Sequence, residues 1–290
     1  MRTLEQLVEQ RRVLGDDQTR ITNRLTDALK QYFPQPLQWF ENKNTRVFCD
    51  FLCRWPTLKA VQLARRSTLQ RFFSEHHVHY RDVVERRILA IQKATPLTTD
   101  EGVVAPNALL VRALVVQLRA ALEATEMFNQ AIAKRAPAHP DFAIFDSFPA
   151  AGPVFAPRLL AAFGEQRERY ADAAEAQKYS GIAPVTKRSG NSTWVHWRWK
   201  CPTFLRQTLV EWAAMTIPRS FWARAYYEQQ RRKGNSHHAA VRALAFKWLR
   251  ILYRCWHDRT PYDEAAYLRA LQKRGSPLIH NLTQSSPQMV

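Results

Sequence analysis

Apolar residues recur along the first segment of the chain at alternating intervals of three and four. Seven of the nine positions in this series are apolar: Leu4, Leu7, Leu14, Ile21, Leu25, Ala28 and Tyr32. This heptad spacing predicts a helix that packs along another helix. Because Arg11 and Gln18 interrupt the series and Gly15 weakens a helix by ~1 kcal/mol, we expect a short coiled coil or a helical hairpin arm. Pro34 and Pro36 end it.

Helical spacing continues from Thr45 to Ala94 and is broken at Pro56. Residues 95–106 are predicted to form a loop, and a second long helix is expected from Asn107 to about Arg135. Its predicted apolar stripe consists of Leu110, Leu114, Leu118, Ala121, Leu122 and Phe128.

The second half of the chain also has a helical pattern. Residues 141–163 predict a short helix, a tight turn at Pro149 to Gly152, and another helix. Amphipathic helices are expected over 204–216 and 238–256, with their tryptophans mostly in a core. The predicted fold class is mainly α, with an N-terminal coiled-coil or helical arm. The expected divisions are an arm and linker (1–44), a helical linker region (45–136), a C-terminal helical domain with a hairpin and a Ser-Gly loop (137–275), and a disordered tail (276–290).

Composition favours a globular protein that binds a polyanion. The chain has 290 residues, 46% of them hydrophobic, with eight glycines and a net charge of +18. Residues 186–260 hold fifteen Lys and Arg, three acidic residues and seven of the nine tryptophans. Cations release counterions from phosphates and aromatic faces stack on bases, so nucleic acid is the expected partner.

Other classes of protein are disfavoured. We expect no membrane association, because no run of eighteen apolar residues exists and the N-terminus lacks the apolar segment of a secretory signal. The predicted location is therefore the bacterial cytoplasm, with the nucleoid. Cys49, Cys53, Cys201 and Cys255 are too scattered for a disulfide framework or a zinc site, and are expected to be structural thiols.

The main candidate for chemistry is Ser189, which follows Lys187 and Arg188 and precedes Gly190. Two cations beside a hydroxyl can hold a phosphodiester and stabilise the charge that develops when phosphorus is attacked. A simple surface turn is the alternative. Trp194, Trp197 and Trp199 alternate after it, which predicts a short strand or extended arm with one aromatic edge.

The turn that ends at Gly152 is a second candidate. Turn amides and the N-terminus of the following helix can bind a backbone phosphate without reading base sequence. Ala150 and Ala151 are unfavourable turn residues, so a purely structural turn is the alternative.

Residues 145–198 resemble the C-terminal domain of the insertion-sequence one-hundred-and-ten family, the DEDD transposases guided by a bridge RNA. The similarity is carried by the hairpin, Gly164, the block Tyr179-Ser180-Gly181-Ile182-Ala183-Pro184, and Ser189-Gly190. Residues 2–34 also resemble the arginine-rich helix that follows the RuvC-like domain in that family. The resemblance implies that Ser189 is a nucleophile that joins covalently to DNA.

Two departures from the family pattern matter. The RuvC-like half, with four acidic metal ligands, does not precede the first helix, so the chain is expected to be an N-terminally short form. Asp16, Asp17 and Asp27 lie on the helical segment and are not expected to replace those ligands. No metal site or other cofactor is therefore expected here, and Mg²⁺ only with a complete RuvC-like domain. Ala150 also replaces the usual hairpin glycine.

The leading hypothesis is a DNA transposase or recombinase in which Ser189 attacks a DNA phosphate. The residues expected to bind nucleic acid are Lys187, Arg188, Gly190, Arg198, Lys200, Arg206 and Gly152. Expected partners are DNA, a structured guide RNA, and further copies of the chain or a full-length transposase. The alternatives are a non-catalytic remnant or regulator of transposition that binds nucleic acid and, less favoured, a general RNA-binding protein.

Overall fold

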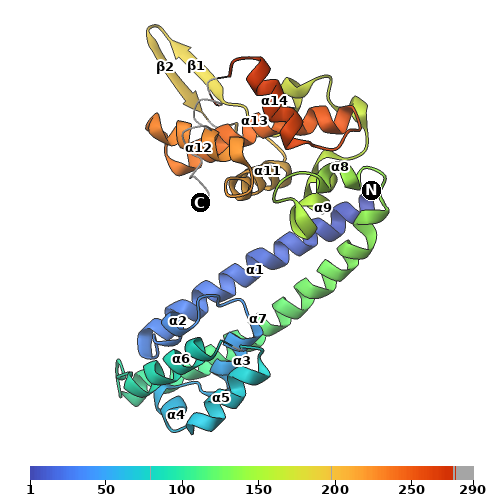
Figure 1. Ribbon diagram of the computed structural model, residues 1–290. Coiled ribbons are helices and arrows are strands. Elements are labelled where there is room, and N and C mark those ends of the chain that lie inside the picture. The colour runs from blue at the N-terminus through green and yellow to red at the C-terminus, as the bar shows by residue number, and fades with distance from the viewer. Residues whose placement is uncertain (79, 197, 277, 279–290) are drawn as a thin grey trace, which may run out of the picture. The chain divides into compact units, whose positions relative to one another are not determined.

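The computed structural model describes residues 1–78, 80–196, 198–276 and 278. Over these residues the chain is mainly α-helical, with one two-stranded antiparallel sheet, which confirms the predicted fold class (Figure 1). The chain divides into two compact units, one of Gln10–Phe128 and one of Met1–Glu9 with Asn129–Val290. Most of the predicted tail lies outside the described residues.

The unit of residues 10–128 is entirely helical among the residues described. Its elements are α1 (Arg2–Tyr32, from residue 10 onward), α2 (Pro36–Trp39), α3 (Arg46–Arg54), α4 (Leu58–Gln62), α5 (Arg66–Glu75), α6 (Arg81–Lys93) and α7 (Glu101–Arg135, up to residue 128). The predicted end of the first helix before Pro34 and the helical character of residues 45–94 are both confirmed. Aromatic side chains fill the core, where Phe40, Phe51 and Phe72 are almost fully buried.

One polar residue of the predicted heptad series proves to bridge two helices. Gln18 is buried on α1, and its side-chain amide donates to the Thr125 hydroxyl at 2.7 Å and to the Ala121 carbonyl at 3.0 Å on α7. Leu25 and Ala28, further along the series, are buried in the same unit. The polar break in the pattern is therefore an inter-helix contact, as in a helical hairpin arm.

The long helix α7 begins earlier than predicted. Residues 101–106 are helical, because the Asp100 side chain accepts from the Gly102 amide at 2.8 Å and its carbonyl accepts from two later amides. Pro106 lies inside the helix, in its second turn, where it cannot donate a hydrogen bond to the Gly102 carbonyl. The predicted stripe is also shifted: Leu110 is 40% exposed, and Val111, Leu114, Val115 and Leu118 are buried.

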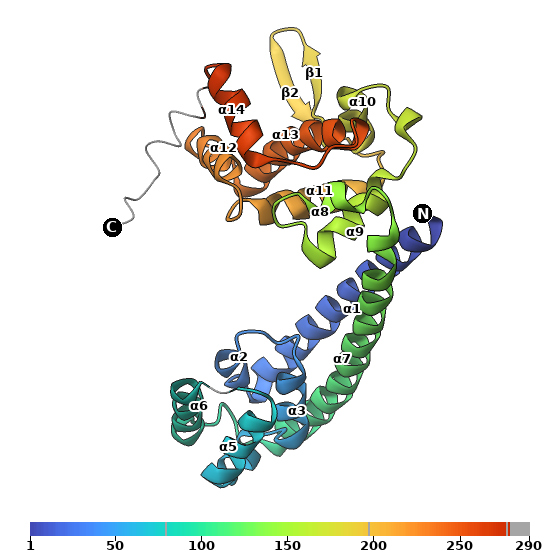
Figure 2. The ribbon, with the colours of Figure 1, turned by 45° about the vertical axis from the view of Figure 1, so that its right-hand side comes forward.

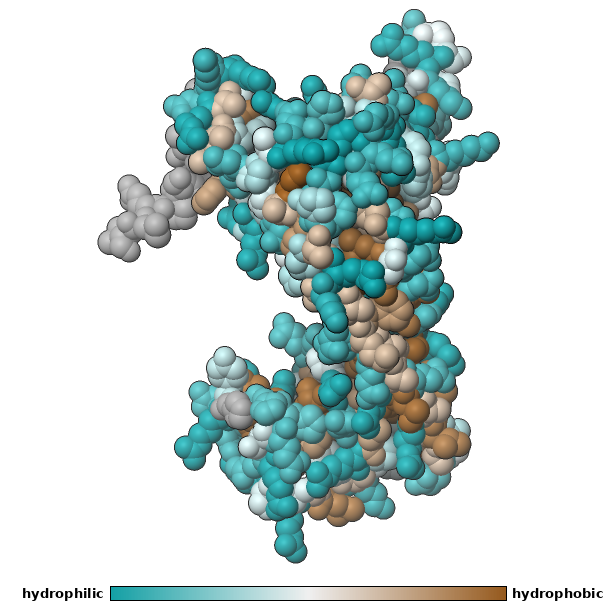
Figure 3. All heavy atoms as spheres, turned by 90° about the vertical axis from the view of Figure 1, so that its right-hand side faces the viewer, coloured by the Kyte–Doolittle hydropathy of each residue, from teal (hydrophilic) through white to brown (hydrophobic). Residues whose placement is uncertain are grey.

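Part of α7 carries apolar residues at its surface. Leu109, Val116 and Met127 are 65–70% exposed, and Figure 3 shows apolar residues at the surface along this helix. Residues 101–138 are long and apolar enough to cross a membrane by length and composition. A core helix of a globular protein passes the same test, and one face of α7 is buried in the core of its unit.

The other unit is built around the long helix α13. Its further elements are η1 (Ala136–Ala138), α8 (Phe142–Asp146), α9 (Gly152–Phe163), η2 (Arg167–Arg169), α10 (Ala173–Tyr179), β1 (Val185–Ser189), β2 (Ser192–His196), α11 (Thr203–Thr216), α12 (Phe221–Arg232), α13 (His237–His257) and α14 (Glu264–Lys273). Helices α10, α11 and α12 all pack against α13, and α9 packs against α8 and α11. The short helix, turn and second helix expected over residues 141–163 are confirmed, as are the helices expected over 204–216 and 238–256.

The tryptophans on the helices of this unit lie in its core, as predicted. Trp212, Trp222, Trp248 and Trp256 are fully buried, and each indole N–H donates a hydrogen bond, to the Pro149 carbonyl, the Tyr262 hydroxyl, the Thr216 hydroxyl and the Gly164 carbonyl respectively. Buried indoles need such partners, because an unpaired donor would carry its full desolvation cost. These four rings therefore hold the unit together and leave base stacking to other residues.

The cysteines are free thiols, as expected. Burial raises the pKa of Cys49 to about 12 and that of Cys255 to about 11. Both thiols are therefore protonated at neutral pH and chemically inert, which fits a structural role.

Candidate nucleic-acid interface

The strands β1 and β2 form a hairpin that stands out from the helices around it in both ribbon views (Figures 1 and 2). The antiparallel register places Ser189 opposite Ser192 and Lys187 opposite Trp194. Gly190 and Asn191 form the two-residue turn, and only Gly190 has a positive φ, of 57°. Positive φ at the first central residue alone fits a type II′ hairpin turn, for which glycine is preferred. The predicted Ser-Gly turn is therefore the tip of a β-hairpin.

Strand alternation separates the residues of the hairpin onto two faces. Ser189 and Lys187 are two positions apart, so they share one face with Trp194, whereas Arg188 lies on the opposite face. All three β1 residues are exposed. A phosphate bound beside the Ser189 hydroxyl would therefore lie on the same face of the hairpin as Lys187. Arg188 would lie on the opposite face from that phosphate.

The Ser189 hydroxyl is exposed, and none of the described residues is hydrogen-bonded to it. It lines neither of the two cavities described below. A free serine hydroxyl is a weak nucleophile and needs a base or an electrophile organised by other groups. Among the described residues, none contacts this hydroxyl as a base that could activate it.

Two of the three alternating tryptophans of the predicted aromatic edge lie among the described residues, and both are exposed. Trp194 lies on β2 and is 42% exposed, and Trp199 follows the strand and is 85% exposed. Trp197 lies outside the described residues. Trp194 and Trp199 are thus the described tryptophans that are open to stack on a base.

The predicted basic residues after the hairpin differ in accessibility. Lys200 is exposed, whereas Arg198 and Arg206 are half-buried. The Arg206 guanidinium donates to the Arg198 carbonyl at 3.4 Å, which holds the start of α11 against the segment that leaves β2. The Arg198 Nε atom is shielded from solvent and hydrogen-bonds to no described residue.

The turn before α9 is exposed at Gly152 and strained at Ala150. Ala150 has a φ of 59°, a left-handed conformation that costs a residue with a side chain about 1 kcal/mol or more. Ala151 is buried, and the Pro149 carbonyl accepts from Trp212 at 3.0 Å, so the turn is anchored in the core. Gly152 begins a helix of twelve residues, and phosphate binding there stays a prediction.

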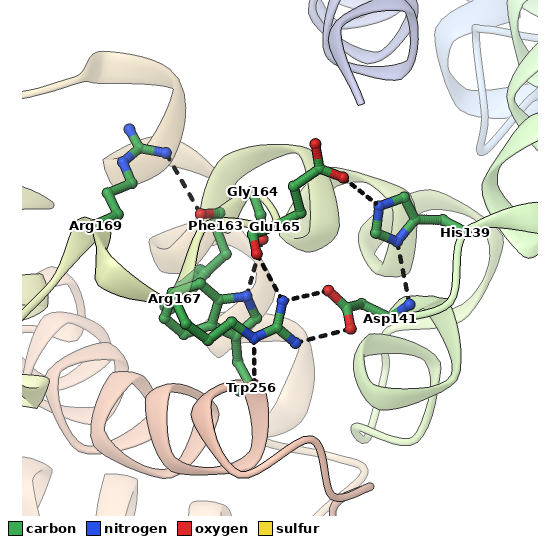
Figure 4. Close-up of polar contacts among 8 residues, drawn as sticks. All are labelled: His139, Asp141, Phe163, Gly164, Glu165, Arg167, Arg169 and Trp256. Atoms are coloured by element: carbon green, nitrogen blue, oxygen red, sulfur yellow. Dashed lines mark hydrogen bonds and ion pairs between the residues drawn. The ribbon is translucent and has the colours of Figure 1, made fainter.

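A polar cluster that the sequence analysis did not identify lies after the C-terminal end of α9 (Figure 4). Arg167 binds both carboxylate oxygens of Asp141, at 2.5 and 2.8 Å, donates to the Trp256 carbonyl at 3.1 Å, and lies over the Trp256 ring at 4.9 Å. These hydrogen bonds from Arg167 lower the pKa of Asp141 despite its burial. The cluster ties the chain after α9 to α8 and α13, which is a structural role.

A second basic surface lies between α13 and α14. It surrounds a cavity of about 550 Å³ whose lining includes Lys247, Arg250, Arg254 and Arg274. Burial lowers the pKa of Lys247 to about 8, and its ammonium lies over the Tyr226 ring at 4.6 Å. The Lys247 ammonium also lies over the Trp222 ring at 5.6 Å, so this cation packs against two aromatic rings.

The described residues do not gather a metal site. They contain no group of three or more His, Cys, Asp or Glu side chains that could hold an ion. On α1, Asp16 and Asp17 form ion pairs with Arg12 and Arg20. The described residues therefore do not by themselves form a site for a divalent metal.

Comparisons with known proteins agree on one relationship. Residues 143–228 match the family model described as the transposase IS116/IS110/IS902 family, a range that includes the whole hairpin and Ser189. A Streptomyces coelicolor protein named as a transposase for the mini-circle IS117 is 30% identical over 252 residues, which cover 84% of this chain and 60% of the relative. An uncharacterized protein of insertion element IS110 from the same organism is 31% identical over 157 residues, or 52% of this chain and 34% of the relative.

The chain therefore spans 60% or less of the length of these relatives. The matched range begins in α8 and ends in α12, so it contains the anchored turn, the hairpin and the helices on which the hairpin stands. Over residues 143–228, this chain carries a domain similar to the transposases of the IS116/IS110/IS902 family.

Proposed function

We propose that the chain acts in DNA transposition and that Ser189 attacks a phosphodiester of a DNA strand. The observation that carries this proposal is the position of Ser189: an exposed hydroxyl at the tip of a basic hairpin, inside the range that matches a transposase family. A hairpin tip is accessible to a duplex or a displaced strand in a way that a buried serine is not.

The proposed step is a transesterification that conserves bond energy. The Ser189 oxygen forms a bond to phosphorus, the bond from phosphorus to one sugar oxygen breaks, and that sugar leaves as a hydroxyl. The serine proton passes to solvent or to a base on a partner. A sugar hydroxyl of a second strand then attacks the phosphoserine, which releases Ser189 and joins the two strands.

Charge near the tip supports binding of the phosphate. Lys187 shares the face of Ser189, and Arg188 reaches from the other face. Lys200, Arg198 and Arg206 extend positive charge past the foot of the hairpin. The amides at the start of α9, at Gly152, are a separate proposed phosphate contact. Cationic donors at the tip stabilise the charge that develops during phosphoryl transfer, whereas those at the foot bind the DNA backbone away from the reacting phosphate.

Activation of Ser189 is assigned to a partner. No described residue hydrogen-bonds the hydroxyl, and the described residues hold no group of three or more His, Cys, Asp or Glu that could bind a metal. A protein that carries the RuvC-like acidic domain, with its Mg²⁺, is therefore expected to complete the site. That partner is a full-length transposase, assembled with this chain and with a structured guide RNA in the cytoplasm, at the nucleoid. The second candidate function is a regulator that binds nucleic acid without chemistry, which the unactivated hydroxyl favours.

A covalent trapping experiment tests the proposal. The purified chain is mixed with a full-length family member whose own corresponding serine is replaced by alanine, and with a labelled suicide DNA substrate that loses a short fragment on cleavage. We expect a detergent-resistant protein–DNA adduct at the mass of this chain, with DNA on Ser189. The chain alone should form none.

Ser192→Ala provides the matched control, because Ser192 is an exposed serine directly across the same turn. Ser189→Ala should abolish the adduct and Ser192→Ala should retain it. An adduct that survives Ser189→Ala contradicts the assignment, and absence of any adduct with the unmodified chain favours the regulator.

A further inference from the structure

A cavity of about 500 Å³ lies at the foot of the hairpin. Its wall is formed by the loop between α10 and β1, the end of β2, one residue of α12, and α13. Its apolar lining comes from Ile182, Pro184 and Phe246. Tyr226 also lines the cavity, and its ring contacts the Lys247 ammonium as well. This size and lining are typical of a small-molecule site.

Two polar atoms beside this cavity have no hydrogen-bond partner among the residues that the structure describes. His196 Nε2 and Arg198 Nε are shielded from solvent and hydrogen-bond to no described residue. Both residues line the cavity. Buried polar groups are nearly always paired, so two orphans on one wall indicate that a bound group completes the site.

The charge of the cavity selects an anion. Arg198 and Arg242 both line it, from the hairpin and from α13, and no Asp or Glu is among its described lining residues. The Arg242 Nε donates to the His238 carbonyl at 3.3 Å, which fixes the guanidinium on the surface of α13. A ligand with an anionic group and a flat apolar part would therefore satisfy both halves of the lining.

We propose that this cavity binds one unstacked nucleotide of the DNA strand that the hairpin engages. The base packs against Phe246 and Tyr226, and its phosphate is held by Arg198 and Arg242. This inference rests on the proposed function, which it deepens by naming how the strand is gripped away from the reacting phosphate. Stacking on aromatic rings tolerates any base, so the site holds a strand without reading its sequence.

The position of the cavity suits this role. His196 lies four residues along β2 from Ser192 at the tip, a separation of roughly 13 Å at ~3.3 Å per residue. One strand of B-form DNA advances ~3.4 Å per nucleotide along its axis. A nucleotide about four positions from the attacked phosphate would thus reach the cavity.

Titration with single nucleotides tests the inference directly. Deoxyadenosine monophosphate is added to the full chain, and binding is followed by the imidazole signals of His196 in NMR spectra. We expect saturable binding that is at least fivefold tighter than that of 2-deoxyribose 5-phosphate, which lacks the base. Inorganic phosphate should be weaker still. Equal binding of the nucleotide and inorganic phosphate would overturn the nucleotide assignment, as would no binding.

Matched variants locate the site. Ala243→Trp fills the cavity and should abolish nucleotide binding, whereas Ala265→Trp, at an exposed position on α14, should retain it. A second pair removes one charge from α13: Arg242→Gln should weaken binding at least fivefold, and Arg254→Gln, whose side chain is 77% exposed, should not. Retained binding in both cavity variants contradicts the proposal.

This titration requires no cleavage and no partner protein. Ser189→Ala should therefore bind the nucleotide as tightly as the unmodified chain does. Nucleotide binding without a covalent adduct would support the cavity as a nucleotide site and contradict the proposed attack by Ser189. A covalent adduct without nucleotide binding would support the attack by Ser189 and contradict the nucleotide site.

Discussion

The pair formed by Asp141 and Arg167 shows how single residues hold α8 to the chain that follows α9. Both side chains are largely buried, at 9% and 13% exposed, and Arg167 uses its remaining donors on main-chain carbonyls. Removing one partner of such a pair leaves an uncompensated charge in a poorly solvated place. The pair is thus more important for stability than the exposed ion pairs of the same unit.

We expect Arg167→Met to lower the free energy of unfolding by about 3 kcal/mol at pH 7, measured by urea denaturation. The pKa of Asp141 is lowered in the folded chain by the hydrogen bonds from Arg167, so its contribution is complete above its unfolded value of about 3.9. The contribution is lost as the pH falls below that value and through the folded pKa. The difference between the two proteins should therefore shrink in acid.

Arg254→Met serves as the control for that experiment. The Arg254 Nε and an Asp258 carboxylate oxygen are 3.8 Å apart, and both side chains are well exposed. The free energy of unfolding should therefore fall by less than about 1 kcal/mol. A similar loss in both variants would mean that burial does not distinguish the two pairs.

At the scale of elements, the foot of the hairpin depends on a close approach between the Gly181 backbone and the Cys201 side chain. Gly181 has a φ of 73°, and a Cβ atom placed there would lie 2.4 Å from the Cys201 sulfur and 2.6 Å from its Cβ. Gly181 precedes β1 and Cys201 follows β2, so this contact joins the two ends of the segment that carries Ser189. Only glycine provides both the conformation and the space.

Gly181→Ala should therefore destabilise the protein by about 2 kcal/mol, from strain and overlap together, in thermal or urea unfolding. Adding Cys201→Gly removes both clashing atoms but not the unfavourable φ, so the double variant should recover part of the loss. Gly190→Ala is a useful comparison, because its Cβ would meet nothing within 4 Å and only conformational strain remains. No recovery in the double variant would contradict the contact.

The sequence predicts the elements better than their contacts. The helices of residues 45–94, 141–163 and 238–256 follow from apolar periodicity, and the Ser-Gly turn follows from its residue types. The start of α7 was missed because Asp100 caps a helix in which Pro106 is tolerated. The Arg167 cluster, the cavity at the hairpin foot and the separation of Arg188 from Ser189 all depend on tertiary placement and strand register, which periodicity does not determine.

At the scale of the whole molecule, the net charge of +18 attracts nucleic acid before any specific contact forms. Such a charge attracts polyanions over distances comparable to the Debye length, and most of the excess lies in residues 186–260. Affinity alone would not separate a transposase from a regulator, because both would use the same charges.

The salt dependence of DNA binding nevertheless reports how many phosphates the protein contacts. We expect the affinity for a DNA duplex, measured by fluorescence anisotropy, to fall linearly with salt on logarithmic axes. Replacing Lys187 and Arg188 together by glutamine should reduce the slope by about 2, near 0.9 for each lost phosphate contact. Glutamine at Arg20 and Arg24 on α1 removes the same charge away from the hairpin, and an equal effect there would contradict a role for the hairpin.

The distribution of the tryptophans gives the protein a built-in optical reporter. Six of the described indoles, including Trp39 and Trp55, are less than 9% exposed, while Trp194 and Trp199 are open to water. Iodide or acrylamide will therefore quench emission from the hairpin and its foot and spare that of the interior. Protection from the quencher on adding DNA would localise the bound strand without any label.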